Sequence, residues 1–300
     1  MSLSALLKLI VLGAIWGGSF LFMRICVPVM GPVMLIEIRV LLAAVFLAGV
    51  AIVQKRRLDV RGQWRHFLIL GLLNSAIPFV LFAFAAHSLS ASLLSILNAT
   101  SPIWGAMIAA VWTRQFPSLK ALAGLMLGIA GVSVIVGFDD QHLTQGAWLA
   151  LAAGLFAAFL YAIAAAYSKI VKGSDAFSNA HGSMWGATLG LLPVAPFFPA
   201  AHMPGLGVIL AIVALGVVCS GIAYMLYFQL VDEVGAPSAL TVTFLVPVFG
   251  TLWGWLFLHE HVGWQTAVGG ILVVTGTALI TGFSPQALLA KPKSLATSKP

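Results

Sequence analysis

Residues 206–229 read LGVILAIVALGVVCSGIAYMLYFQ, a stretch without a single charged side chain. A helix needs about 20 consecutive apolar residues to cross the hydrocarbon core of a bilayer, so this stretch predicts a transmembrane helix. The whole chain has the same character, since 61% of its 300 residues are hydrophobic and 8% are charged. The composition therefore indicates an integral membrane protein. It argues against a soluble catalytic domain, a nucleic-acid-binding module and a β-barrel, whose strands would alternate polar and apolar residues.

Apolar runs bounded by charge, proline or glycine predict an all-α fold of ten transmembrane helices. We expect these helices at residues 3–23, 33–53, 67–87, 91–112, 120–137, 146–168, 177–199, 206–229, 236–258 and 264–283. The first run reaches spanning length through residues 16–23, so we interpret it as a retained helix rather than a signal peptide. Residues 284–300 contain Lys, Pro and Ser and are expected to form a disordered cytoplasmic tail.

Basic residues predict the orientation of the helices. If the N-terminus is cytoplasmic, thirteen basic residues fall on the cytoplasmic side and one, Arg24, falls outside. The thirteen are Lys8, Lys55, Arg56, Arg57, Arg61, Arg65, Arg114, Lys120, Lys169, Lys172, Lys291, Lys293 and Lys299. This asymmetry predicts a multi-pass protein of the cell inner membrane with both termini in the cytoplasm. The net charge of +7 is accordingly a surplus in loops and not a patch for nucleic acid.

A constant shift in residue number, the one that carries residue 70 onto residue 215, superimposes the first part of the sequence on the second without a gap. We call this shift the repeat offset. It places LGLLNSAIPFVL (70–81) over LGVVCSGIAYML (215–226), and a proline and several glycines keep the register in the helices that follow. The register indicates a duplication, with a first five-helix repeat at residues 1–140 and a second at residues 141–283. Because five is an odd number, the second repeat must lie upside down relative to the first. Inverted repeats of this kind place a ligand site near the bilayer midplane, where the halves meet.

Several residues match the sequence pattern of one transporter family. They are the run Trp16-Gly17-Gly18-Ser19-Phe20, Arg39, Pro247, Glu260, Gly269 and Gly276. Over essentially its whole length the chain resembles the EamA-type members of the drug/metabolite transporter superfamily. The resemblance implies ten helices and export of small metabolites such as amino acids, with YddG-like aromatic amino-acid exporters among the members. One departure is Gln115, because the family often has Glu after the proline of its fourth helix.

Three predicted helices contain a proline deep in the span, and each proline frees a backbone carbonyl four residues earlier. The prolines are Pro78, Pro102 and Pro247, and the freed carbonyls belong to Asn74, Asn98 and Thr243. A freed carbonyl beside a polar side chain is tolerated at membrane depth where it is buried in protein or faces a water-filled cavity. We therefore interpret these positions as lining a substrate pathway. The alternative is that they are ordinary kinks, satisfied locally and used for packing.

Aromatic residues near the middle of their spans form a second set of candidates for substrate binding, because hydrocarbon offers no partner to an indole N–H or a phenol O–H. They are Trp16, Trp104, Tyr161, Trp185 and Tyr224. Trp16 and Tyr161 are repeat equivalents, so we expect them to approach the pseudo-twofold axis from both halves. Core packing is the alternative for each ring. The hydroxyls of Ser101, Ser220 and Thr241 would join the same region or bond to their own helices.

Charges within the membrane are scarce, and the two plausible ones, Glu37 and Arg39, lie on the second helix. At a spacing of two residues they point to different faces, so they are not a mutual pair. Arg39 either clasps the C-terminus of a neighbouring helix or contacts the substrate. If transport is coupled to protons, Glu37 is the first candidate for the proton carrier, followed by His87 and His181.

The sequence contains no Walker A motif, nucleophile elbow or paired-carboxylate site, and His259-Glu260-His261 lacks the spacing of a zinc helix, so we expect no enzyme, cofactor or metal site. The inverted repeat predicts a secondary transporter that moves a small organic metabolite by alternating access, and the family resemblance implies that the metabolite is exported. Its expected partners are lipid and a neutral or aromatic amino acid, or a lipophilic cation. The alternatives are an uncoupled channel-like facilitator, an intramembrane enzyme such as a lipid-modifying transferase, and a scaffold or chaperone subunit.

Overall fold

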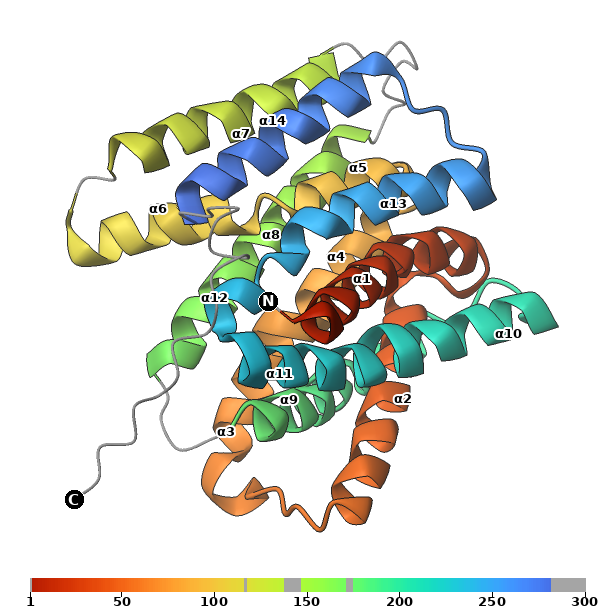
Figure 1. The fold of residues 1–300 in the computed structure, drawn as a ribbon. Coiled ribbons are helices and arrows are strands. Elements are labelled where there is room, and N and C mark those ends of the chain that lie inside the picture. The colour runs from red at the N-terminus through yellow and green to blue at the C-terminus, as the bar shows by residue number, and fades with distance from the viewer. Residues whose placement is uncertain (1, 116–117, 138–146, 171–174, 282–300) are drawn as a thin grey trace, which may run out of the picture.

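The structure of the chain is a computed structural model that describes residues 2–115, 118–137, 147–170 and 175–281. Within these ranges every regular element is a helix (Figure 1). The predicted boundary between the repeats at residues 140 and 141 and the predicted disordered tail at residues 284–300 lie outside the described residues.

Helices follow one another along the chain with short connections. They are α1 (Leu3–Met30), α2 (Pro32–Val53), α3 (Val60–Gly71), η1 (Leu72–Ala76), α4 (Ile77–Ala85), α5 (Ala91–Asn98), α6 (Ser101–Thr113), α7 (Leu119–Gly137), α8 (Ala147–Ile170), α9 (Ala176–Leu191), η2 (Ala195–Phe197), α10 (Leu206–Val213), η3 (Ala214–Ile222), α11 (Ala223–Val234), α12 (Ala236–Ala239), α13 (Val242–Leu258) and α14 (Trp264–Thr281). Here η1 and η3 are π-helices and η2 is a 3₁₀-helix. Some consecutive elements, such as α3, η1 and α4, form one continuous rod.

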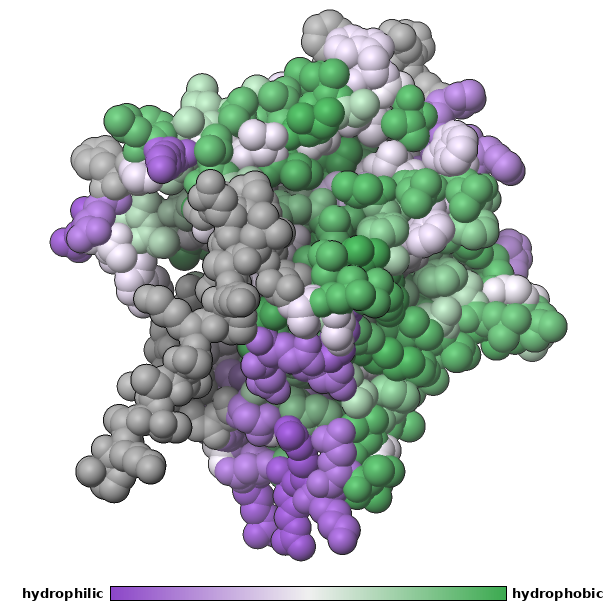
Figure 2. Space-filling model, in the orientation of Figure 1, coloured by the Kyte–Doolittle hydropathy of each residue, from purple (hydrophilic) through white to green (hydrophobic). Residues whose placement is uncertain are grey.

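Seven helical segments of the described chain are long and apolar enough to cross a membrane, and two shorter apolar helices lie at residues 119–135 and 242–258. Large hydrophobic side chains are exposed on the outside of the bundle, and Figure 2 shows a broad hydrophobic face with hydrophilic atoms gathered at its lower edge, where the α2–α3 loop lies in Figure 1. Lipid tails solvate such a face. The prediction of an all-helical, multi-pass membrane protein is therefore confirmed, while the number of ten spans stays a prediction.

Several predicted helix ends are wrong, and the third helix, predicted to start at residue 67, already begins at Val60. The sequence pattern ends the first helix at residue 23, before the charge of Arg24, but α1 continues to Met30 because the Arg24 guanidinium donates a hydrogen bond to the carbonyl of Ala86 at 2.8 Å. The pattern extends the seventh helix to residue 199. Instead α9 ends at Leu191, since Pro193 and the prolines after it cannot continue an α-helical ladder.

Both π-helices occupy equivalent places in the two halves of the chain. Shifted by the repeat offset, η1 falls at residues 217–221, which lie within η3. A π-helix carries an extra residue in a turn and leaves carbonyls poorly paired, and such turns are frequent at functional sites. In η3 the Ser220 hydroxyl compensates by donating to the Leu215 carbonyl at 3.1 Å.

The helices α7 and α14 lie side by side along their length (Figure 1), and glycines allow the close approach. A Cβ atom placed on Gly131 would lie 2.6 Å from the carbonyl oxygen of Gly269 and 2.8 Å from a methyl group of Val273. A Cβ atom on Gly124 would lie 2.5 Å from the carbonyl oxygen of Gly276. The repeat offset relates the two contacts, so both ends of the pair depend on glycine.

We expect Gly131→Leu to destabilise the protein by about 1–3 kcal/mol, because the backbone atoms it meets cannot move aside as a flexible side chain would. The measurement is the melting temperature of the purified protein in detergent. Gly49→Leu is the matched control, since nothing lies within 4 Å of a Cβ atom on Gly49. Equal melting temperatures for Gly131→Leu and the wild type would contradict this packing.

Candidate functional site

A cavity of about 1080 Å³ lies at the centre of the bundle. Helices of both halves line it, including α1, α2, α4 and α6 from the first and α8, α9, η3, α11 and α13 from the second. Its volume suits a small organic molecule, since pockets for such ligands usually measure about 300–1,000 Å³. Among the described residues that line it, Arg39 is the one with a charged side chain.

Most of the predicted binding residues lie together on this cavity. The predicted residues that line it are Trp16, Asn74, Asn98, Ser101, Pro102, Tyr161, Tyr224, Thr241 and Thr243, and Arg39 joins them from the predicted coupling set. The walls thus combine aromatic rings with hydroxyl and amide groups around a single cation.

The aromatic walls repeat in the two halves. Trp16 on α1 packs against Tyr224 and Tyr227 of α11, with ring centroids 6.4 and 5.6 Å apart. Tyr161 on α8 packs against Phe79 and Phe82 of α4, with centroids 6.4 and 6.1 Å apart. Each residue of the first set is separated from its counterpart in the second by the repeat offset. The cavity therefore has two equivalent aromatic clusters, each built by one helix from either half.

Tyr227, Phe79 and Phe82 were not predicted, although the sequence carried a signal for them. Tyr224 and Tyr227 are three residues apart on one helix and so share a face. The same repeat offset that pairs Trp16 with Tyr161 would also have found Phe79 and Phe82.

The helical structure is interrupted at the cavity wall by a turn at residues 99–100, between α5 and α6. Here the Ser101 hydroxyl donates at 2.7 Å to the Asn98 carbonyl, which Pro102 leaves free. A similar break lies at residues 240–241, where the hydroxyls of Thr241 and Thr243 donate to carbonyls three residues earlier, at 2.7 and 2.8 Å. The predicted hydroxyls are thus bonded to their own chain, and the amide side chain of Asn98 is a polar group that lines the cavity in their neighbourhood.

Asn74 lies on the π-helix η1 and joins the two halves across the cavity wall. Its side-chain nitrogen donates to the phenol oxygen of Tyr224 at 3.2 Å. Its position on η1 turns this amide toward the second half, and Leu70, one turn earlier, also lines the cavity.

Arg39 on α2 is 3% exposed. Its Nε donates to the Ser220 hydroxyl of η3 at 3.0 Å, and its Cζ lies 3.8 Å from the ring centroid of Phe79. This hydrogen bond goes to a π-helix rather than to the C-terminus of a neighbouring helix. Arg39 therefore connects the helices α2, η3 and α4 at the cavity wall.

Eight predicted residues lie away from the cavity lining: Pro78, Trp104, Trp185, Ser220, Pro247, Glu37, His87 and His181. The Trp185 indole donates within its own helix to His181 Nε2 at 3.0 Å, and the Trp104 ring packs edge-on against Phe159 at 5.5 Å. Pro78 is buried in the first turn of α4, and His87 is exposed in the turn after it. Glu37 is buried, and its two carboxylate oxygens have no hydrogen-bond partner within the described chain.

One end of the cavity is open. The lining residues at the end of α6 and in the turn before α13 are exposed, with Trp112 at 71% and Leu240 at 51%. This is the end at which α6 and α8 finish and α12 begins, at the left of Figure 1. At the opposite end the cavity is closed by its floor, which the buried residues Phe20, Met23 and Phe82 form. The rings of Phe20 and Phe82 pack against each other there.

Glu260 holds the closed end together. Its carboxylate accepts hydrogen bonds from Ala91 N at 2.8 Å and from both Ser92 N and Ser92 Oγ at 3.3 and 3.2 Å, so it caps the N-terminus of α5. The Nε of Arg24, on α1, lies 3.7 Å from the same carboxylate. Glu260 was predicted to be a loop residue, and it lies in the α13–α14 loop, but its side chain is 8% exposed and ties three helices together.

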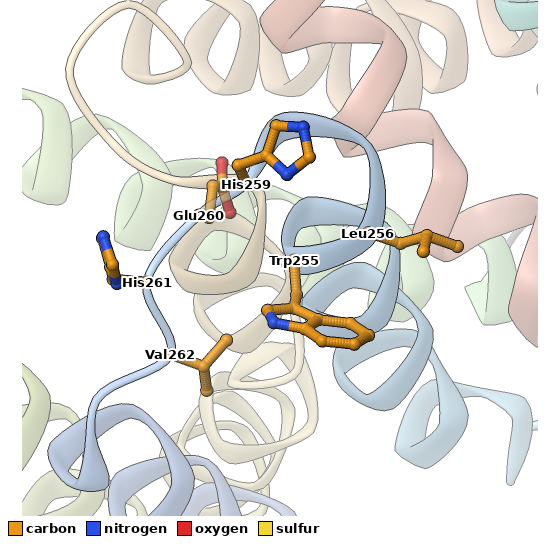
Figure 3. Close-up of a pocket in the computed structure, with 6 residues that line it drawn as sticks. All are labelled: Trp255, Leu256, His259, Glu260, His261 and Val262. Carbon is orange, nitrogen blue, oxygen red and sulfur yellow. The ribbon is translucent and has the colours of Figure 1, made fainter.

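A second, shallower cavity of about 560 Å³ lies on the outside of this closed end (Figure 3). It is lined by Glu260, by the two histidines beside it and by hydrophobic residues such as Trp255. Figure 3 shows His259 and His261 on opposite sides of Glu260, and no group of three metal-ligating residues occurs in the part of the chain that the structure describes.

The repeat equivalent of Glu260 at the open end is Gln115. Arg114 and His259, the residues before them, have the same left-handed backbone conformation, with φ of 51° and 53°. The two loops therefore start alike, yet Glu260 is buried against α5 while Gln115 is exposed. The difference coincides with the closed and open ends of the cavity.

Nearby, Asp175 begins α9 at the open end by accepting hydrogen bonds from Phe177 N at 2.9 Å and Ser178 N at 3.1 Å. Partial burial acts to raise the pKa of this carboxyl group. The hydrogen bonds from Ser178 and Phe177 and the charge of Arg56, 3.7 Å away, outweigh it, so the pKa lies below its ordinary value.

Comparison with known proteins agrees with this architecture. The model of the EamA-like transporter family matches the chain twice, at residues 3–137 and 146–282. An uncharacterized transporter of Bacillus subtilis (strain 168), YoaV, is 24% identical over 282 residues, which cover 92% of this chain and 96% of the relative. An uncharacterized transporter of Archaeoglobus fulgidus is 27% identical over 289 residues, or 91% and 95% of the two chains.

A probable terminal-alkyne amino-acid exporter of Streptantibioticus cattleyicolor is also similar, at 26% identity over 191 residues and 62% of each chain. A protein of known crystal structure shares the fold with a TM-score of 0.66 and 17% sequence identity, over 93% of this chain and 96% of that one.

Proposed function

The chain belongs to the EamA-like transporter family, and on that premise we propose that it is a secondary transporter that exports a small organic metabolite by alternating access. One observation carries the proposal. A central cavity lined by both halves is open at one end of the bundle and closed at the other, where Glu260 caps α5. An alternating-access transporter needs a site that faces one side of the membrane at a time.

The chain crosses the membrane ten times as two inverted five-helix repeats. Three pairs of features related by the repeat offset support this arrangement: the two π-helices, the two aromatic clusters and the two glycine contacts between α7 and α14. Exchange of the closed and open ends then amounts to each half taking the conformation of the other. In the alternate state, Gln115 occupies the place that Glu260 has here.

The open end faces the cytoplasm, and both termini are cytoplasmic in the inner membrane. The excess of basic residues in the loops at this end supports the orientation, including Lys55, Arg56 and Arg57 between α2 and α3. An exporter takes up its cargo from this side, so an inward-open cavity is the state that loads.

The cargo is a neutral or aromatic amino acid or a related compound. Aromatic rings on two sides of the cavity offer faces for stacking, and the absence of a cluster of cations among the described lining residues disfavours nucleotides and sugar phosphates. The similarity to a probable amino-acid exporter points in the same direction.

Glu37 carries the proton if transport is coupled to a pH gradient, because it is a buried acid without a hydrogen-bond partner in the described chain. Labelled amino acids are given to proteoliposomes with and without an imposed pH gradient. Wild type is expected to concentrate cargo against its gradient, and Glu37→Gln is expected to equilibrate it only.

Equilibration without concentration in the wild type would favour the alternative of an uncoupled facilitator. Full concentration by Glu37→Gln would exclude Glu37 from coupling. Flux no faster than that of protein-free liposomes, for every amino acid in the panel, would contradict the proposed function itself.

A further inference from the structure

Arg39 brings a positive charge to the cavity, and no negative partner pairs with it in the described ranges of the chain. Its Nη1 has no hydrogen-bond partner in the described part of the chain, although the atom is buried. The ion pairs of the described residues are Lys8 with Glu233, Arg24 with Glu260 and Arg56 with Asp175, and Arg39 takes part in none of them. Glu37, two residues away on α2, does not line the cavity.

The groups that interact electrostatically with Arg39 are Cys219, Tyr161 and Tyr224. Side chains of these types are uncharged at neutral pH, so they supply dipoles but no counter-charge. A buried charge without a partner is among the most unfavourable arrangements in a protein, and within a membrane such groups face a cavity and mark the path of a substrate. A negatively charged partner of Arg39 is therefore missing from the residues that the structure describes.

The guanidinium is already fixed on two sides. Nε is bonded to Ser220, and Cζ lies over the Phe79 ring, 3.8 Å from its centroid. The remaining donors are those of the Nη groups, and Arg39 lines the cavity. A planar fork of N–H donors matches the two oxygens of a carboxylate.

On the basis of the proposed function, we propose that Arg39 binds a carboxylate group of the cargo, and that the cargo is an organic monocarboxylate with an aromatic or other apolar body. One cation among the described lining residues matches one negative charge. Phosphate esters and dicarboxylates would leave a second charge unmatched, and a lipophilic cation would meet repulsion. The neighbouring rings of Phe79, Tyr161 and Tyr224 receive the apolar body.

Three compounds with the same ring system test this assignment in the wild type. L-tryptophan carries a carboxylate and an ammonium group, indole-3-propionate carries the carboxylate alone, and tryptamine carries the ammonium group alone. Binding to the purified protein is measured by calorimetry, and flux is measured in proteoliposomes. We expect both carboxylates to bind and tryptamine to bind at least tenfold more weakly.

Variants of Arg39 test the residue. Arg39→Gln is expected to weaken binding of L-tryptophan by about 10–100-fold, the usual effect of losing a hydrogen bond to a charged group. It is expected to leave the weak binding of tryptamine unchanged or improve it. Arg39→Lys is expected to retain part of the affinity. Arg57→Gln is the control, because Arg57 is exposed in the α2–α3 loop.

The outcomes separate this inference from the proposed function. Flux of tryptamine at the rate of L-tryptophan would overturn the carboxylate site and leave transport standing. Carboxylate-dependent binding without flux would support the site and contradict transport. Binding of none of the three compounds would overturn the site, and the comparison of compounds in the wild type keeps it falsifiable even if Arg39→Gln does not fold.

Discussion

Replacing Glu260 with alanine is expected to lower transport at least tenfold, because the cavity then cannot stay closed at the end that Glu260 caps, which we propose faces outward. The carboxylate accepts hydrogen bonds from Ala91 and Ser92 at the N-terminus of α5 and lies 3.7 Å from Arg24. A hydrogen bond to a charged group is worth about 1.5–3 kcal/mol, and a difference of about 1.4 kcal/mol changes a population ratio tenfold. Losing this group is expected to shift the population toward states that are open at this end.

The shift is measured as access to a cysteine at Met23, which is buried at the floor of the cavity. In a background without Cys26 and Cys219, an impermeant thiol reagent added outside intact cells is expected to label Met23→Cys slowly, and much faster when Glu260→Ala is added. His261→Ala is the matched control from the same loop, where the imidazole is exposed. Equal labelling with and without Glu260 would contradict the role of this residue as the closure.

Asn98→Leu is expected to reduce flux by about tenfold or more, since cargo that loses a polar partner in a desolvated site loses about 1–3 kcal/mol of binding. Asn98 lines the cavity next to the break between α5 and α6. Leucine has a similar size and suits an apolar surrounding, so the variant is expected to insert and melt like the wild type. Thr243→Val, on the equivalent helix, is expected to behave in the same way.

The measurements are flux in proteoliposomes and size-exclusion profiles of the purified variants. Ser95→Ala is the control on the same helix, because Ser95 is buried, does not line the cavity and bonds to the Ser92 carbonyl of its own helix. Full flux by both Asn98→Leu and Thr243→Val would leave these residues a role in packing alone.

Hydropathy was sufficient to predict the helical membrane architecture, because the need for long apolar segments is the strongest constraint on such chains. Predictions from hydropathy were least accurate near charged residues and prolines. Arg24 does not end α1, since a carbonyl from another helix satisfies it, and the π-helices η1 and η3 have no signature in their residues.

The faces of the helices were the hardest part of the site to predict. In a soluble protein a polar stripe tells the outside from the inside, but lipid and protein interior are both apolar. Trp104 and Trp185 therefore could not be told from Trp16 by their surroundings in sequence. The internal repeat supplied the missing information for Trp16 and Tyr161, whose equivalence extends to the rings that they contact.

The role of Glu260 could not be predicted because it depends on a contact between distant parts of the chain. Glu260 and Ala91, which are joined by a hydrogen bond, are 169 residues apart in the sequence. A helix N-terminus accepts an anion from anywhere in the chain. The sequence shows Glu260 and its repeat equivalent, Gln115, but it does not indicate which helix the Glu260 carboxylate caps or at which end of the bundle.

Counterflow in proteoliposomes tests the central claim, alternating access through the cavity, most directly. Vesicles are loaded with unlabelled L-tryptophan, and a trace of labelled L-tryptophan is added outside. Alternating access predicts that internal cargo accelerates exchange, so the label accumulates transiently above its equilibrium level in vesicles with wild-type protein and not in protein-free vesicles. Uptake of the label at the same rate with empty and loaded vesicles would contradict alternating access and indicate a continuous pore.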